Sequence, residues 1–211
     1  MLTRIKKLIT VKGDDRKSSL GLVHVYTGQG KGKTTATLGL AMRALGAGLN
    51  VCMIQFMKSA DTGELFTVKN HLPEMKIIQF GVEALTDKQS RIFEFENGIK
   101  KENNSSASFR FMPDDAEKEA CRRAMEYAWN VIRSENYNML ILDEVNCALD
   151  KGLIKIDEIM KMVKDHDNIE LVLTGQGAPR ELVKVADYFS DIRKIKHPWD
   201  KGVKARRGIE Y

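Results

Sequence analysis

The sequence contains few cysteines, few prolines and no long apolar run, and each absence excludes a class of protein. Its three cysteines, Cys52, Cys121 and Cys147, form no CxxC pair, so we expect neither a zinc site nor a redox motif. Four prolines among 211 residues exclude collagen-like and proline-rich chains. No stretch approaches the roughly 18 apolar residues that span a bilayer, and the N-terminus lacks an apolar run of signal-peptide length. We therefore expect a cytoplasmic protein with free thiols and no membrane partner.

The chain has a small excess of positive charge. Lysine and arginine number 34 against 29 aspartates and glutamates, which gives a net charge of +5. This excess suits an anionic ligand as well as nucleic acid and does not choose between them. Apolar residues make up 43% of the chain, enough to bury a core in a single domain of this length. Residues 1–19 are basic and then polar, and we interpret them as an N-terminal appendage, either a short amphipathic lid helix or a frayed end.

Apolar runs of strand length alternate with helical patterns over residues 20–211. This alternation predicts an α/β domain with a mainly parallel sheet and helices on both faces. Segment 81–113 fits neither the helical nor the strand period of apolar residues. It carries four phenylalanines (Phe93, Phe95, Phe109 and Phe111), and we interpret it as an elaborated segment with a functional role. The predicted strands are 22–26, 51–56, 76–80, 139–142 and 170–173, and the predicted helices are a stretch ending at residue 46, 114–134 and 157–164.

Residues 27–35 read Thr-Gly-Gln-Gly-Lys-Gly-Lys-Thr-Thr between a predicted strand and a predicted helix. This context is typical of a phosphate loop, in which glycines let backbone N–H groups and a helix N-terminus surround phosphate oxygens. Thr27 stands where the usual pattern has glycine. We expect Lys33 to reach the phosphates and Thr34 to hold Mg²⁺ or Mn²⁺. The predicted fold is thus a phosphate-loop NTPase-like domain, and the predicted nucleotide-binding residues of the loop are Gly28, Gln29, Gly30, Lys31, Gly32, Lys33, Thr34 and Thr35.

A second motif completes this prediction. Residues 139–142 form an apolar strand that delivers Asp143 and Glu144 at its carboxyl end. Phosphate-loop proteins use such an aspartate in the metal site, so we predict Asp143 as a metal ligand together with Thr34. Glu144 is predicted as a second metal contact or a general base. ATP or a similar nucleotide follows from the two motifs, but they do not fix the reaction.

Further segments, spread over residues 22–211, narrow the reaction. They are 41–46, 51–58, 63–64, 142–144, 173–179, 196–205 and 208–211. Together with the two motifs they resemble, in order, the phosphate-loop family of ATP:corrinoid adenosyltransferases. The resemblance implies transfer of the 5′-deoxyadenosyl group of ATP to the Co(I) centre of a corrinoid such as cobalamin, with release of triphosphate. It also implies a homodimer and an upstream reductase such as a flavodoxin.

The resemblance also assigns roles to residues. Since Co(I) is itself a strong nucleophile, the protein must position C5′ and stabilise the departing triphosphate. Lys33 and Glu144 are the predicted catalytic residues. Arg43 matches an arginine that the family places on its first helix, so it is either a nucleotide contact or a surface arginine.

Three departures from the family pattern stand out. Gln176 replaces an arginine, no Gly-Phe-Thr-Trp stretch follows the third strand, and segment 81–113 is longer than usual. We hypothesise that phenylalanines of this segment cover the lower face of the corrin instead. Two alternatives remain at this point. One is a phosphate-loop ATPase acting on nucleic acid, which the basic stretch 194–207 suggests without any base-stacking module, and the other is a nucleotide-gated corrinoid-binding protein.

Overall fold

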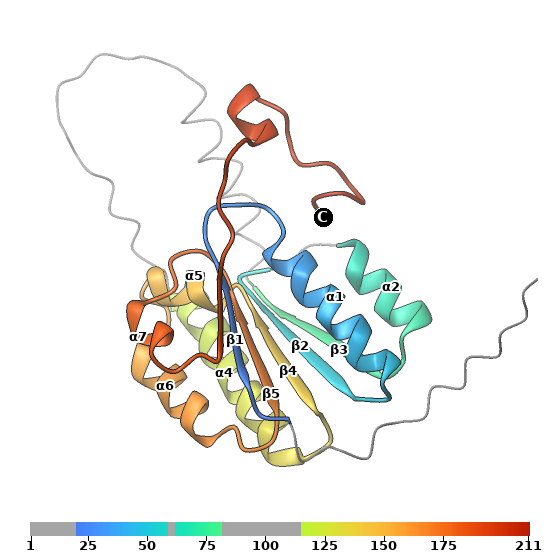
Figure 1. Cartoon of the computed structure of the whole chain (residues 1–211), viewed down its shortest axis with the longest axis vertical. Helices are drawn as coiled ribbons and strands as arrows, with labels where there is room; N and C mark the ends of the chain where they lie inside the picture. The colour runs from blue at the N-terminus through green and yellow to red at the C-terminus, as the bar shows by residue number, and fades with distance from the viewer. Residues whose placement is uncertain (1–19, 59–61, 82–114) are drawn as a thin grey trace, which may run out of the picture.

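A six-stranded, wholly parallel sheet forms the centre of the molecule (Figure 1). The computed structural model describes residues 20–58, 62–81 and 115–211. The strand order is β3-β2-β4-β5-β1-β6, so the carboxyl ends of all strands meet at one edge, where open α/β sheets bind their ligands. The strands are β1 (Val23–Thr27), β2 (Val51–Phe56), β3 (Met75–Phe80), β4 (Met139–Asp143), β5 (Glu170–Thr174) and β6 (Tyr188–Asp191).

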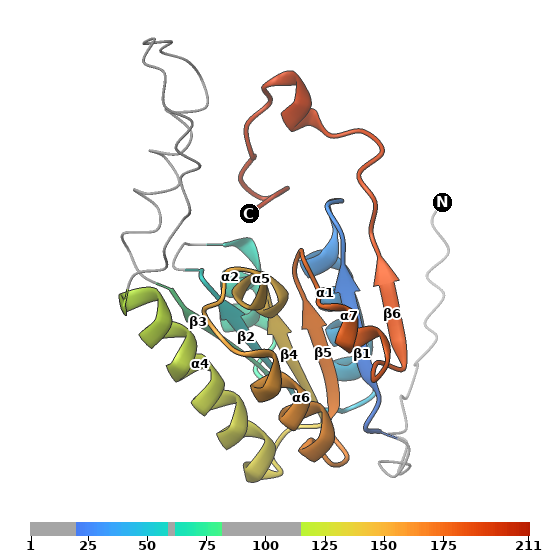
Figure 2. The ribbon, with the colours of Figure 1, turned by 90° about the vertical axis from the view of Figure 1, so that its left-hand side faces the viewer.

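Helices cover both faces of this sheet (Figure 2). One face carries α1 (Lys33–Gly46) and α2 (Gly63–His71). The other carries α4 (Asp115–Ser134), α5 (Val145–Asp150), α6 (Ile156–Asp165) and α7 (Arg180–Val183). A short 3-10 helix, η2 (Pro198–Lys201), lies in the C-terminal segment, which returns over the carboxyl edge of the sheet.

The central strands are apolar throughout because both of their faces are buried. In β2, Cys52 and Ile54 pack toward α4, whereas Val51 and Met53 pack toward α1 and α2. This alternation follows from the two-residue period of a strand. Each of these side chains is fully buried, and burying one of the larger ones stabilises the fold by roughly 1.5–3 kcal/mol. The two apolar layers therefore fix the positions of the carboxyl ends of the strands.

Helix α4 packs along this core through small residues. Ala124 and Ala128 are fully buried, and Cys121 and Val131 lie on the same face. Asp115 and Glu117 are in the first turn, where carboxylates favour the positive end of a helix. The helix predicted over 114–134 is thereby confirmed.

The predicted fold class is confirmed, as are all five predicted strands and the three predicted helices, to within one or two residues at their ends. Five of the described elements were not predicted: α2, α5, α7, η2 and the edge strand β6. The predicted appendage 1–19 and residues 82–113 of the predicted elaborated segment lie outside the described residues. Among the described helices, none has the length and apolar character to cross a membrane.

Candidate active site

The loop between β1 and α1 has the backbone that its glycines predict. Gly28 and Gly32 adopt left-handed φ angles of 97° and 117°, which side chains rarely adopt. A Cβ atom on Gly28 would lie 2.4 Å from the carbonyl oxygen of Ile192. The Gly30 N–H group donates a hydrogen bond to the same oxygen at 2.7 Å. The segment after β6 therefore holds the loop in place.

Lys33 is the first residue of α1 and folds back onto this loop. Its Nζ atom donates hydrogen bonds to the carbonyl oxygens of Gly28, at 2.8 Å, and Gly30, at 2.9 Å. The residue is buried, at 8% exposure. Neutral carbonyls compensate a buried ammonium only in part, so this arrangement favours an anion in the loop.

Asp143 ends β4 and is fully buried. Its Oδ1 atom accepts hydrogen bonds from the hydroxyls of Thr34, at 2.9 Å, and Thr174, at 2.7 Å. Its Oδ2 atom accepts from Gln55 Nε2, at 3.1 Å, and from Lys58 Nζ, at 2.6 Å. Four donors are what a buried carboxylate needs to offset its lost hydration. The structure thus brings together Thr34 and Asp143, the two residues predicted to share a metal ion.

A buried polar network extends from Asp143 into the neighbouring strands. Gln55 Nε2 also donates to Glu64 Oε1 of α2 at 3.1 Å, and Gln79 Nε2 of β3 donates to Gln55 Oε1 at 2.9 Å. Gln55 is fully buried within the otherwise apolar β2. It was missed in the sequence, although an amide inside an apolar strand signals a buried polar partner.

Glu144 occupies the strained turn between β4 and α5, with a φ of 64°. Its N–H group donates to Thr174 Oγ1 at 3.0 Å, and its carboxylate accepts a hydrogen bond from Cys147 Sγ at 2.7 Å. Burial, and next the charge of Glu144, raise the pKa of the Cys147 thiol to about 12. The thiol therefore keeps its proton and fixes the Glu144 carboxylate from one side.

Two cavities adjoin at this edge of the sheet. The smaller, of about 230 Å³, is lined by the phosphate loop, Glu144, Gln176 and His197. The larger, of about 580 Å³, lies between α1, α2 and the C-terminal residues. Thr34, Thr35, Ile209 and Glu210 line both cavities. The larger one has apolar walls that include Leu38, Met42, Val68, Leu72 and Met75.

One polar atom in the larger cavity has no partner within the described residues. Thr62 precedes α2 and is 7% exposed, and its Oγ1 atom makes no hydrogen bond. A buried hydroxyl without a partner costs about 1–3 kcal/mol. Among the described residues, Thr62 thus adds an unpaired polar group to the wall of the larger cavity.

The C-terminal residues close over both cavities. Hydrogen bonds from the guanidinium and N–H groups of Arg206, together with the charges of Arg206 and of Lys31 in the phosphate loop, lower the pKa of Glu210 to about 2. This arrangement places segment 208–211, which carries part of the family resemblance, beside the loop.

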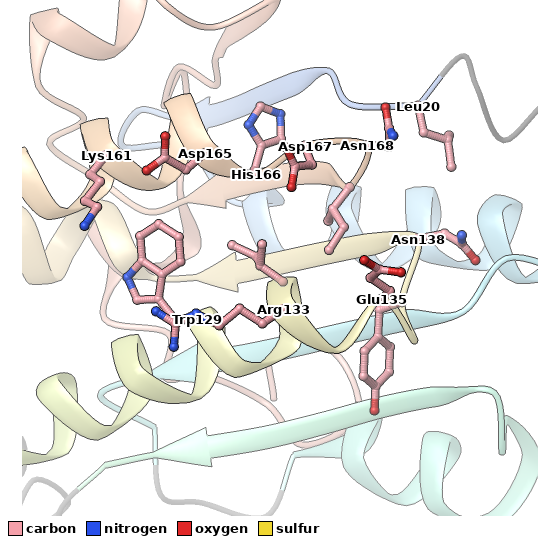
Figure 3. A pocket seen from close by; sticks show the side chains of 13 residues that line it. Leu20, Trp129, Arg133, Glu135, Asn138, Lys161, Asp165, His166, Asp167 and Asn168 are labelled. Carbon is pink, nitrogen blue, oxygen red and sulfur yellow. The ribbon is translucent and has the colours of Figure 1, made fainter.

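A third cavity, of about 950 Å³, lies at the opposite edge of the sheet (Figure 3). Its lining includes Leu20, Asn138 and Ile169, which precede β1, β4 and β5. Trp129 stands there with the cations of Arg133 and Lys161 within 5.8 Å of its ring centre. None of the predicted site residues lines this cavity, so the candidate active site is the pair of cavities at the carboxyl edge.

The structure separates Arg43 from the other predicted site residues. It is exposed in the last turn of α1 and lines neither cavity of the site. Ten residues of helix place it about 15 Å along the axis from Lys33. Its predicted contact with the nucleotide stays a prediction.

Gln176, by contrast, lines the smaller cavity, so the family's arginine at this position would face the phosphate loop. The site residues that sequence analysis missed are Gln55, Lys58, Thr62, Cys147, Thr174, His197 and Glu210.

The donor set fits a magnesium ion bound together with a nucleotide. No cluster of three histidine, cysteine, aspartate or glutamate side chains occurs in the part of the chain that the structure describes. A metal cage built from protein alone is therefore absent there. Mg²⁺ instead takes one or two carboxylates and fills its remaining positions with phosphate oxygens and water. Thr34 and Asp143 beside a phosphate loop suit that mode.

Comparison with known proteins agrees with the motifs. Residues 19–211 match the family model described as ATP:corrinoid adenosyltransferase BtuR/CobO/CobP. A corrinoid adenosyltransferase from Sinorhizobium sp is 32% identical over 209 residues, which cover 98% of this chain and 86% of that protein. The corrinoid adenosyltransferase of Escherichia coli K12 is 28% identical over 210 residues, covering 99% and 94%. The comparisons give no support to a nucleic-acid ATPase or to a binding protein without turnover.

Proposed function

Because the chain belongs to the ATP:corrinoid adenosyltransferase family, we propose that its two adjoining cavities hold the two halves of ATP during adenosyl transfer. The family's reaction moves the 5′-deoxyadenosyl group of ATP to the Co(I) centre of a corrinoid, in adenosylcobalamin synthesis. The proposal rests on the lining residues that the two cavities share. Thr34 and Thr35 line a compartment of phosphate-loop groups on one side and an apolar compartment on the other.

The reaction needs no nucleophile from the protein. The electron pair of Co(I) forms the cobalt–carbon bond at C5′, while the C5′–O bond breaks and its electrons pass to the triphosphate. No proton is transferred. The protein therefore contributes alignment of C5′ and stabilisation of the charge that the triphosphate gains.

The triphosphate is assigned to the smaller cavity. The loop N–H groups and the N-terminus of α1 supply donors for its oxygens. Lys33 Nζ, which donates hydrogen bonds to the loop carbonyls of Gly28 and Gly30, supplies a positive charge at the same place. Lys33 thus acts on the leaving group.

Thr34 and Asp143 are proposed to hold Mg²⁺ or Mn²⁺ with the triphosphate, and Glu144 to contact the metal or the nucleotide. The ion, when bound, neutralises charge that builds up on the leaving group. The full burial of Asp143 supports its role, because a carboxylate in low dielectric attracts a cation more strongly than one in water.

The adenosyl group is assigned to the larger cavity. A volume of about 580 Å³ lies within the range of small-molecule pockets. Leu38, Met42 and Val68 offer apolar surface to a flat base, and Thr62 Oγ1 offers the polar contact that it lacks in the free chain.

Three finer features are proposed on the family resemblance: a homodimer, a flavodoxin-type protein as upstream reductant, and a cytoplasmic location. The free thiols of Cys52, Cys121 and Cys147 suit a reducing compartment. Light scattering of the purified chain tests the dimer. Transfer to a Co(II) corrinoid with reduced flavodoxin as sole electron source tests the reductant.

The direct test of the function mixes the enzyme with MgATP and cobalamin reduced chemically to Co(I). The expected result is the visible absorbance of an alkylcobalamin, which photolysis destroys. Lys33→Ala serves as the inactive control, and Lys164→Met, on an exposed position of α6, as the neutral one. Binding of the corrinoid without a photolabile product would overturn the proposal.

A further inference from the structure

A partly exposed lysine reaches the fully buried carboxylate of the site. Lys58 follows β2, and its Nζ atom lies 2.6 Å from Asp143 Oδ2. The side chain of Lys58 is 25% exposed, whereas that of Asp143 is 0% exposed. The ammonium thus enters the site from the side of the larger cavity, which Lys58 also lines.

The backbone on either side of Lys58 is constrained, which fixes the direction of its side chain. Met57 adopts a left-handed φ of 55°, which is unfavourable for a residue with a side chain. Its N–H group donates to the carbonyl oxygen of Phe80 at 2.8 Å. Gly81 packs so closely that a Cβ atom there would lie 2.5 Å from Lys58 O. Strain that neighbouring structure maintains is a mark of functional positions.

The hydrogen bonds of Asp143 show which donor can give way to a metal ion. Oδ1 is taken by Thr34 and Thr174, and on Oδ2 Gln55 is fully buried and tied to Glu64. Lys58 is the fourth donor, and it has a long side chain with access to the cavity. A cation that contacts Oδ2 would repel the ammonium and take its position.

We propose that Lys58 occupies the metal position on Asp143 in the free chain and, once displaced, contacts the triphosphate oxygen that leaves C5′. The second half rests on the proposed function. Lys58 lines the larger cavity, as do Thr34 and Thr35, which also line the smaller one and so mark the boundary between the two compartments. The bond that breaks lies at that boundary, and its electrons pass to the oxygen that the ammonium faces. Lys58 keeps its proton throughout.

The first half is tested without nucleotide or corrinoid. Binding of Mn²⁺ to the free protein is measured by electron paramagnetic resonance for the wild type, Lys58→Met and the surface control Lys164→Met. We expect Lys58→Met to bind Mn²⁺ at least tenfold more tightly than the other two proteins, because the ion no longer competes with an ammonium. Equal or weaker binding by Lys58→Met would overturn this half.

Lys58→Gln covers the case in which Lys58→Met does not fold. Its amide still donates to Asp143 but carries no charge, and the same tenfold criterion applies. Circular dichroism establishes that each variant is folded before its affinity is compared.

The second half is tested by kinetics with preformed Co(I) cobalamin and saturating Mg²⁺. We expect Lys58→Met to lower kcat at least a hundredfold, the effect of removing one preorganised donor, with the KM for ATP within threefold. Lys58→Arg should stay within tenfold of the wild type, since it keeps the charge. A kcat for Lys58→Met within threefold of the wild type would refute the catalytic role. A wild type that makes no product refutes the proposed function instead, and leaves the Mn²⁺ result standing.

Discussion

Replacing Thr174 by valine tests how the two carboxylates of the site are held. Thr174 is fully buried at the end of β5. Its hydroxyl accepts a hydrogen bond from Glu144 N–H at 3.0 Å and donates one to Asp143 Oδ1 at 2.7 Å. Valine has nearly the same shape and makes neither bond. The substitution therefore removes two hydrogen bonds without opening a cavity.

The expected loss of unfolding free energy follows from the two groups that lose their partner, the Glu144 N–H group and the Asp143 carboxylate. An unpaired backbone N–H costs about 1–3 kcal/mol, and a hydrogen bond to a charged acceptor contributes about 1.5–3 kcal/mol. Because Glu144 N–H is only partly buried, we take the lower values and expect a loss of about 2.5 kcal/mol. This is a large share of the 5–15 kcal/mol that typically stabilises a domain, and it should lower Tm by about 5–10 °C.

Urea unfolding with an unchanged m-value measures this loss. Thr67→Val is the matched control, because the Thr67 hydroxyl donates to Gly63 O on the exposed side of α2. We expect the control to change the free energy of unfolding by less than about 0.5 kcal/mol. A loss below about 1 kcal/mol for Thr174→Val would refute the description of Thr174 as the link between Asp143 and Glu144.

Three further predictions concern single side chains. Lys33→Ala should abolish adenosyl transfer and strongly weaken ATP binding in calorimetry, since it removes the charge that faces the triphosphate; an unchanged rate at saturating ATP would make the loop structural. Thr62→Val should raise the KM for ATP about tenfold through the loss of one hydrogen bond to the ligand. The stability of the protein to urea should not fall, because Thr62 Oγ1 has no hydrogen-bond partner among the described residues. An unaltered KM would remove Thr62 from the nucleotide site. The Cys147 thiol, with its pKa raised to about 12 from an unfolded value of 9.0, should react with a disulfide reagent at pH 8 about a thousandfold more slowly in the folded than in the unfolded chain. Its reaction should accelerate as the pH rises toward 12. Rapid modification of Cys147 at pH 8, seen by mass spectrometry, would contradict the description of a half-buried thiol bound to Glu144.

The parts of the fold that were predicted have strong local signals. Strand β2 is apolar on both faces, and α4 keeps a helical period over 20 residues. Strand β6, by contrast, has four exposed residues at the edge of the sheet, and α5 has six residues. Neither is long enough to establish a period. The phosphate loop was predictable because its residues are contiguous.

The rest of the site depends on contacts between distant parts of the chain. Lys58 and Asp143 are 85 residues apart and meet only because β2 and β4 are neighbours in the sheet. No spacing rule reveals such a pair. Arg43 is close to the phosphate loop in sequence but not in space. Its position on α1 was predicted, but it lies in the last turn of that helix, away from the loop. The phenylalanines proposed to cover the corrin and the lid helix of the appendage lie outside the described residues, and both stay predictions.

The account's central claim is that the protein transfers an adenosyl group and acts on triphosphate as a leaving group rather than activating water. The most direct measurement is ³¹P NMR of the phosphate products beside the optical yield of adenosylcobalamin, with Co(I) cobalamin present and then omitted. The account predicts one tripolyphosphate for each cobalt–carbon bond formed, and negligible orthophosphate when the corrinoid is left out. Robust release of orthophosphate without corrinoid, in the absence of an equivalent alkylcobalamin, would contradict the account and assign the site to ATP hydrolysis.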